Sequence, residues 1–223
     1  MEAVAERVAD VRRRIAAAGG DPETLTLVAV TKGFGPEQVE AVRDAGVHDI
    51  GENYAHELLA KAGQSGDGAR WHFLGAIQRR KVRALAPFVH LWQSVDRIVA
   101  GHEVARHAPG AAVLVQVNVT GKPGRPGCSW SDAPALVDGL RLADLDVRGL
   151  MAVGSTAGSR NEFRRLASLG TSLGLEEISM GMSGDLEVAV EEGSTMVRVG
   201  RALFGPRPGA RDLRRYSHPR GGW

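Results

Sequence analysis

Short runs of apolar and β-branched residues alternate along this chain with stretches in which apolar residues recur every three or four positions. The run Leu25–Thr31 is the clearest example, since its residues favour strands and glycines follow it at positions 33 and 35. Pro36 then opens a stretch in which Val39 and Val42 share one helical face. The pattern therefore predicts a buried strand, a loop and a helix, in that order.

The same alternation repeats about eight times. The further predicted strands are 47–50, 71–74, 89–93, 111–117, 147–153, 177–180 and 195–199. The predicted helices are 4–18, which precedes the first strand, and 36–45, 54–62, 77–85, 96–107, 133–142, 161–169 and 184–192. Strands that alternate with helices form parallel sheets covered by helices. We therefore predict an α/β fold, a single (β/α)8 TIM-type barrel with an extra N-terminal helix, and keep a doubly wound open sheet as the alternative.

The predicted barrel covers residues 1–205, and residues 206–223 are predicted to form a flexible basic tail because they are rich in Pro, Gly and Arg. The formal net charge of +2 is too small for a nucleic-acid footprint. Cys128 is the only cysteine, so no internal disulfide can form and a reducing compartment is expected. We see neither a signal peptide nor an apolar stretch long enough for a membrane span, and we expect a cytoplasmic protein.

Lys32 is the first candidate for chemistry, because it stands where the first strand gives way to a loop. In a (β/α)8 barrel the carboxyl ends of the strands form the rim that carries active sites. Lys32 is either a solvated charge or a nucleophilic amine that forms a Schiff base with a carbonyl. The second reading requires that burial or a neighbouring cation lower the lysine pKa from its ordinary value of about 10.4.

Two turns near the end of the chain could bind an anion. Ser183 is a candidate N-cap, and the glycines on either side of the Met182–Ser183 pair let a ligand approach the backbone. Free N–H groups and the helix dipole would then attract a phosphate. The segment Val199–Arg201 offers a second set of N–H groups, and turns after the last two strands are the usual phosphate site of such a barrel. The alternative is a capped helix with nothing bound.

Three polar residues in or beside apolar strands need an explanation. The Arg198 guanidinium lies in a buried strand and requires a partner, either Glu177 or a ligand. Asn53 either caps the next helix or contacts a ligand. His72 lies in an aromatic strand, which is typical of a hydrogen-bonded core residue, and the histidines show no metal-binding spacing.

Six segments in order resemble the YggS/PROSC group of pyridoxal phosphate (PLP) homeostasis proteins, which are similar to the barrel domain of alanine racemase. The segments are 28–32, 51–53, 71–78, 148–151, 179–183 and 193–200, within a resemblance that covers about 5–206. The resemblance implies a PLP site made of Lys32, Asn53, Met182, Ser183, Arg198, Gly200 and Arg201.

The resemblance also implies a role for each of these residues. Lys32 would hold PLP as a Schiff base, and Ser183 with the backbone of residues 200 and 201 would hold its phosphate. Arg198 would face the pyridine nitrogen, Asn53 would lie near the ring, and Met182 would pack on the pocket wall. An arginine at the nitrogen discourages ring protonation and makes PLP a weaker electron sink.

The chain departs from the family pattern at several positions. Thr31 replaces a usual serine, Ala76 a common histidine, and the segment Gly184–Leu186 a usual acidic pair. Arg201 replaces a usual threonine, so a phosphate contact by that side chain cannot be carried over. Arg201 could add a charge-assisted contact or point to solvent.

We expect a PLP carrier or regulator that is not an enzyme, is a monomer and exchanges PLP with apo PLP-dependent enzymes. Alanine racemase-like enzymes use a second domain that brings an opposing base, and neither Tyr54 nor Tyr216 follows a recognisable second domain. The alternatives are a single-domain PLP-dependent amino-acid racemase and a barrel enzyme that acts on a sugar phosphate through Lys32.

Overall fold

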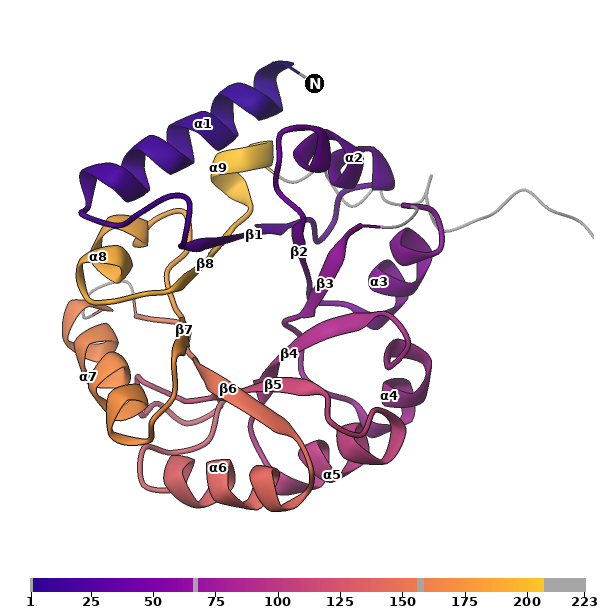
Figure 1. The fold of residues 1–223 in the computed structure, drawn as a ribbon, viewed down its shortest axis with the longest axis vertical. Helices are drawn as coiled ribbons and strands as arrows, with labels where there is room; N and C mark the ends of the chain where they lie inside the picture. Colours follow the sequence, from indigo (N-terminus) through magenta and orange to yellow (C-terminus); the bar gives the residue numbers. More distant parts are fainter. Residues whose placement is uncertain (1, 66–67, 156–158, 207–223) are drawn as a thin grey trace, which may run out of the picture.

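The protein is a closed eight-stranded parallel barrel surrounded by helices, as a computed structural model that describes residues 2–65, 68–155 and 159–206 shows (Figure 1). Each strand pairs with the next along the chain, and the last pairs with the first. The strands are β1 (Thr26–Val30), β2 (Asp49–Glu52), β3 (Arg70–Phe73), β4 (Val89–Val95), β5 (Ala112–Gln116), β6 (Asp146–Met151), β7 (Glu177–Ser179) and β8 (Met196–Val199). The predicted (β/α)8 barrel is confirmed, and the open-sheet alternative is wrong.

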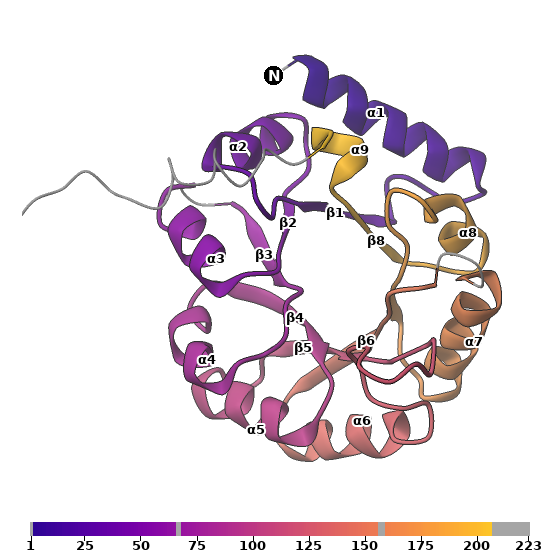
Figure 2. The same ribbon diagram turned by 180° about the vertical axis from the view of Figure 1, so that it is seen from behind.

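Helices form the outer ring in both views of the molecule (Figures 1 and 2). They are α1 (Glu2–Ala17), α2 (Pro36–Asp44), α3 (Ala55–Ala62), α4 (Arg79–Leu85), α5 (Ile98–His107), α6 (Ala133–Leu142), α7 (Ser159–Ser172), α8 (Leu186–Glu191) and α9 (Arg201–Phe204). Seven of them match predicted helices that follow a strand, with ends that differ by a few residues. No helix in the described part of the chain has the length and apolar character needed to cross a bilayer.

The extra N-terminal helix is also confirmed. Helix α1 buries Val8, Val11 and Ile15, the stripe that its sequence pattern indicates. It lies across α9, α8 and α2, on the side of the barrel where the chain closes (Figure 2). Helix α9 was not predicted. It follows β8 directly and occupies the place between α1 and the barrel rim.

The core has two layers that follow from strand alternation. Residues that face outward pack against the helices, and a smaller cluster made only of strand residues fills the inside of the barrel. That inner cluster consists of Val28, Leu91, Ala112, Leu114, Met151 and Met196. Truncation of a leucine in such a layer costs about 2–5 kcal/mol of stability. The inner layer therefore supports the strand ends on which the candidate site is built.

The tail predicted for 206–223 lies outside the described residues from 207 onward, so its flexibility stays a prediction.

Candidate functional site

One cavity of about 820 Å³ opens at the carboxyl ends of the strands. Its wall is made of residues at or after the ends of most of the strands. All seven site residues predicted from the sequence lie on it: Lys32, Asn53, Met182, Ser183, Arg198, Gly200 and Arg201. Sequence reasoning missed other wall residues, including Phe34, Gln116, Met151 and Ser155. Phe34 and Ser155 lie in loops, and Gln116 and Met151 are the last residues of β5 and β6. Only Met151 falls in a segment that resembles the family, and no chemistry was assigned to it from the sequence.

Lys32 is half-buried on this wall, in a tight turn after β1. The N–H of Phe34 donates to the carbonyl of Thr31 at 3.0 Å, which closes the turn. Gly33 has φ +75°, a conformation that a side chain would disfavour. The backbone thus fixes where the lysine side chain leaves the strand.

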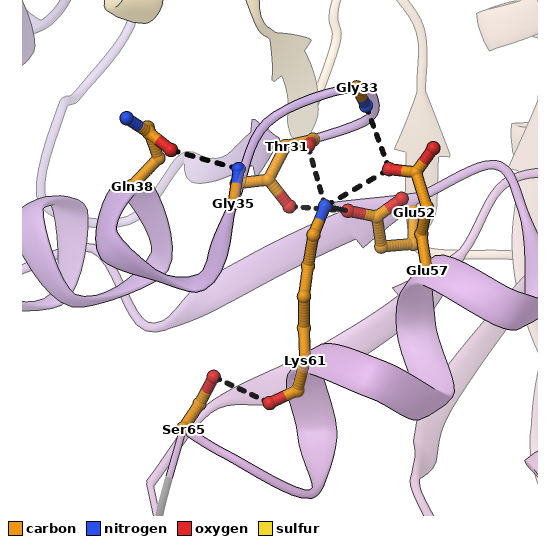
Figure 3. A network of polar contacts seen from close by, with 8 residues as sticks. All are labelled: Thr31, Gly33, Gly35, Gln38, Glu52, Glu57, Lys61 and Ser65. Atoms are coloured by element: carbon orange, nitrogen blue, oxygen red, sulfur yellow. Dashed lines mark hydrogen bonds and ion pairs between the residues drawn. The ribbon is translucent and has the colours of Figure 1, made fainter. Parts of the chain in front are cut away.

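Polar side chains of β2 and α3 bind this turn (Figure 3). We name this group the Lys61 cluster and define it as Glu52 of β2, Glu57 and Lys61 of α3, and the turn residues Thr31 and Gly33 that they bind. The Lys61 ammonium donates to the Thr31 carbonyl at 2.7 Å, to Glu52 at 2.5 Å and to Glu57 at 3.1 Å. The Thr31 hydroxyl donates to Glu52 at 2.6 Å, and the Gly33 N–H donates to Glu57 at 2.7 Å. The residues on both sides of Lys32 are therefore tied to α3.

Electrostatics make the Lys61 cluster interdependent. The side chains of Lys61 and Glu52 are 5% and 0% exposed. Burial raises the pKa of the Glu52 carboxyl, while the charge of Lys61 and the hydrogen bonds from Lys61 and Thr31 oppose that rise. A buried charge that loses its partner is strongly destabilising. The cluster is therefore sensitive to the removal of any one charged member.

The two turns predicted to bind an anion lie against each other. The Ser183 hydroxyl accepts a hydrogen bond from the Ala202 N–H, at 3.2 Å, in the first turn of α9. Gly200 is the N-cap of α9, and a Cβ there would lie 3.0 Å from the Val30 carbonyl oxygen. A larger residue would thus press on β1. This close approach brings the β8 turn next to the strand that carries Lys32.

Ser183 does not cap α8, contrary to the prediction. Helix α8 begins at Leu186 with Asp185 at its N-cap, and the Asp185 carboxylate accepts the Met182 N–H at 2.7 Å. The helix thus begins two residues later than the predicted start at 184. Arg14 of α1 donates to the Ser183 carbonyl at 3.1 Å, which fixes the turn from outside.

Met182 and Arg201 lie at the outer part of the cavity wall. Met182 is 37% exposed, and Arg201 is exposed at the start of α9. Both side chains contact the cavity and reach solvent.

Arg198 is buried and reaches the cavity from inside the barrel. Its Nη1 donates to the Ser179 hydroxyl at 2.6 Å, and its Nη2 donates to the Ala152 carbonyl at 2.8 Å. Glu177, the ion-pair partner considered as one of two alternatives for Arg198, instead lies 3.8 Å from Arg148. Burial lowers the pKa of Arg198 to about 10, so the guanidinium is charged at neutral pH. From its position on the cavity wall, the guanidinium can donate a hydrogen bond to an acceptor atom of a ligand.

Asn53 does not cap α3 either, because Tyr54 is the N-cap residue and makes no side-chain cap bond. The Asn53 Oδ1 is buried and has no hydrogen-bond partner within the described structure. An orphaned buried acceptor costs about 1–3 kcal/mol. An acceptor of this kind on the wall of a cavity fits a ligand that supplies a donor.

His72 is a hydrogen-bonded core residue, as predicted. Its Nε2 lies 2.9 Å from Asp49 and its Nδ1 lies 2.7 Å from Gln93. It is 1% exposed and is not part of the cavity wall. In the described residues no three metal-ligating side chains gather into a group.

Known proteins resemble this chain over almost its whole length. The family model for the alanine racemase N-terminal domain matches residues 1–208. The pyridoxal phosphate homeostasis protein of Pseudomonas aeruginosa is 40% identical over 93% of this chain and 97% of its own. This chain belongs to the pyridoxal phosphate homeostasis protein family. The family member from Escherichia coli K12 is 31% identical over 93% of this chain and 98% of its own.

Solved structures extend the comparison to the fold. PipY of Synechococcus elongatus, solved with PLP bound, has a TM-score of 0.79 at 29% identity and matches 91% of this chain and 100% of its own. Alanine racemase of Corynebacterium glutamicum has a TM-score of 0.73 at 18% identity. This match covers 94% of our chain but 62% of the racemase, so the two proteins share the barrel fold.

Proposed function

We propose that this protein binds PLP in the cavity at the strand ends and serves PLP homeostasis as a carrier or regulator, with PLP held as a Schiff base on Lys32. The observation that carries the proposal is that one cavity is lined by a lysine amine, a buried arginine and two turns rich in N–H groups. The homeostasis proteins to which the chain is similar, and PipY with PLP bound, support the choice of ligand.

Each wall residue has a role in this proposal. The Lys32 amine binds the aldehyde carbon, and Ser183 with the N–H groups of residues 200 and 201 binds the phosphate. The exposed Arg201 side chain adds positive charge at the mouth. Asn53 and Met182 contact the ring. The site thus presents donors and positive charge where PLP is anionic.

Arg198 decides how reactive a bound ring would be. PLP supplies an electron sink, and that sink is strongest when its pyridine nitrogen is protonated. Arg198 remains charged at neutral pH, and a guanidinium can only donate hydrogen bonds. It therefore donates to the pyridine nitrogen, which stays unprotonated because it acts as the acceptor. This arrangement favours storage over turnover.

A racemase is the alternative, and it needs a second base opposite Lys32. Within the described residues, His72 is buried away from the cavity and Tyr54 is 49% exposed, packed beside His56. Neither is placed as that base. We therefore propose a cytoplasmic monomer that hands PLP to apo PLP-dependent enzymes without turnover of amino acids.

Two measurements test the proposal. The PLP-loaded protein is mixed with an apo aminotransferase, and we expect aminotransferase activity to appear as PLP moves across. The loaded protein is also incubated with each L-amino acid in deuterated water, and the α-proton is followed by NMR. Rapid α-proton exchange that Lys32→Ala abolishes would show an enzyme instead of a carrier. Light scattering of the purified protein measures whether it is a monomer.

A further inference from the structure

A chain of hydrogen bonds crosses the inside of the barrel, from Arg198 at the cavity to the opposite rim. Arg198 Nη1 donates to Ser179 Oγ at 2.6 Å, and Ser179 Oγ donates to Gln93 Oε1 at 2.7 Å. Gln93 Nε2 lies 2.7 Å from His72 Nδ1, and His72 Nε2 lies 2.9 Å from Asp49 Oδ1. We name these five residues, Arg198, Ser179, Gln93, His72 and Asp49, the barrel chain.

Strand alternation explains why these side chains meet. Next to them in sequence, Val197, Ile178, Trp92 and Ile50 belong to the layer that packs against the helices. The barrel-chain side chains therefore point inward from β8, β7, β4, β3 and β2. Asp49 is the first residue of β2, whereas Ser179 is the last of β7, so the chain runs from the lower rim towards the cavity.

Every bond in the barrel chain has the same direction. A guanidinium only donates, so Ser179 accepts from Arg198 and gives its own proton to Gln93. The Gln93 amide then donates through Nε2, which makes His72 Nδ1 an acceptor and leaves the proton on Nε2. That proton points at Asp49, which only accepts when ionised. Gln93 Nε2 also lies 3.0 Å from the Met196 sulfur, which fixes the amide orientation.

The two ends of the barrel chain carry opposite charges. Among the described residues no carboxylate lies within ion-pair distance of the Arg198 guanidinium. At the other end Asp49 is paired with Arg70 at 2.5 Å. Burial alone would raise the pKa of Asp49, but hydrogen bonds from His72 and Arg70 hold it well below its usual range. Hydrogen bonds in such a chain polarise one another. The negative charge of Asp49 therefore makes His72, Gln93 and Ser179 better hydrogen-bond acceptors, and Ser179 accepts from Arg198.

We propose that Ser179, Gln93 and His72 are positioning residues that hold the Arg198 guanidinium against the ring of a bound PLP. This inference rests on the proposed function. None of the three lines the cavity, and each is at most 1% exposed. Their chain of hydrogen bonds reaches the cavity wall at Arg198. Loss of the chain leaves the guanidinium held by the Ala152 carbonyl alone, so it can turn about that bond and its bond to the pyridine nitrogen weakens.

The test compares substitutions at Gln93, the middle of the barrel chain. Gln93→Met removes the bonds to Ser179 and His72. We expect about a tenfold weaker PLP affinity, which is the loss that corresponds to one hydrogen bond to a charged group. We also expect a shift of the visible absorption band of the loaded protein. Gln93→Glu should bring PLP affinity to within about twofold of wild type and return the absorption band to its wild-type position. A carboxyl can keep the bonds to Ser179 and His72 whether the proton sits on the carboxyl or on His72.

Controls separate this role from a general effect on the fold. Ser194→Ala removes a buried hydroxyl that bonds only backbone carbonyls, and it should leave PLP affinity and absorption unchanged. Ser179→Ala is a smaller change than Gln93→Met and should weaken PLP binding to a similar extent. If Gln93→Met does not fold, Ser179→Ala takes its place in the test. In an Arg198→Met background neither substitution should have a further effect on PLP.

Two outcomes would overturn the inference. One is wild-type PLP affinity and absorption in both Gln93→Met and Ser179→Ala. The other is an equal loss of affinity with and without Arg198, because the effect would then bypass the guanidinium. If the unsubstituted protein takes up no PLP at all, the proposed function fails instead.

Discussion

The ammonium of Lys61 lies 2.7 Å from the carbonyl oxygen of Thr31, the residue that precedes Lys32. This bond joins α3 to the turn that carries the proposed Schiff-base lysine. Because Glu57 holds the N–H of Gly33 from the same helix, the turn is fixed on both sides of Lys32. The position of the Lys32 amine therefore depends on residues that lie away from it in the sequence.

Replacement of Lys61 should affect both stability and PLP uptake. Lys61→Met leaves the Glu52 carboxyl buried without its cation, so we expect a loss of about 3–5 kcal/mol in the free energy of unfolding. PLP uptake should also slow because the Lys32 turn loosens. Urea denaturation and the rise of the PLP absorption band measure the two effects.

Two further variants check this explanation. The double variant Lys61→Met with Glu52→Gln should recover part of the stability, because it removes the buried charge. Lys81→Met removes an exposed lysine of α4 and should change neither quantity. Equal stability of Lys61→Met and wild type would show that the Lys61 cluster does not hold the turn.

Ser183→Ala tests the phosphate site. The hydroxyl accepts the Ala202 N–H and lies on the cavity wall, so its loss should remove one polar contact to the phosphate of a bound PLP. We expect a roughly tenfold to hundredfold weaker PLP affinity, as for a hydrogen bond to a charged group. Ser168→Ala on the exposed face of α7 is the control. Unchanged affinity by titration would remove Ser183 from the site.

The pH dependence of stability should report on Asp49. Its folded-state pKa lies below the unfolded value of about 3.9, so its ionised form stabilises the fold above about pH 4. This contribution is lost as pH falls further towards the folded pKa. Asp49→Asn should therefore be less stable than wild type at pH 7, by about 1–3 kcal/mol, and the difference should narrow below about pH 4. A difference that widens in acid would contradict this account.

Cys128 should be an unreactive thiol. Burial raises the pKa of Cys128 to about 11, and only the thiolate is nucleophilic. At pH 8 we expect iodoacetamide to alkylate the folded protein far more slowly than the urea-unfolded protein, with a rate that rises until about pH 11. Mass spectrometry over time measures both rates, and equal rates would show that the thiol is not shielded.

Periodicity predicted the barrel because each buried strand and each amphipathic helix carries its own local signal. Barrel closure then places the residues after β1, β7 and β8 at one rim, so Lys32, Ser183 and Gly200 could be grouped from the sequence alone. Helix α9 was missed because four residues from Arg201 to Phe204 carry no periodic pattern.

Side-chain partners were harder to predict. Glu177 was one of the two partners considered for Arg198, the other being a ligand. It begins β7 at the lower rim, whereas Ser179 ends β7 next to the guanidinium. The spacing of Glu57 and Lys61 suggests a helical ion pair, yet nothing in the sequence shows that this pair is buried against the Lys32 turn. These contacts depend on how strands and helices are packed, which a single sequence does not specify.

The most direct test of the account is to load the protein with PLP, reduce it with borohydride and map the labelled peptide. The account predicts that the visible absorption band disappears on reduction and that the pyridoxyl group is found on Lys32. Lys32→Ala should acquire no label. A pyridoxyl group on Lys61, Lys81 or Lys122 in place of Lys32 would contradict the account.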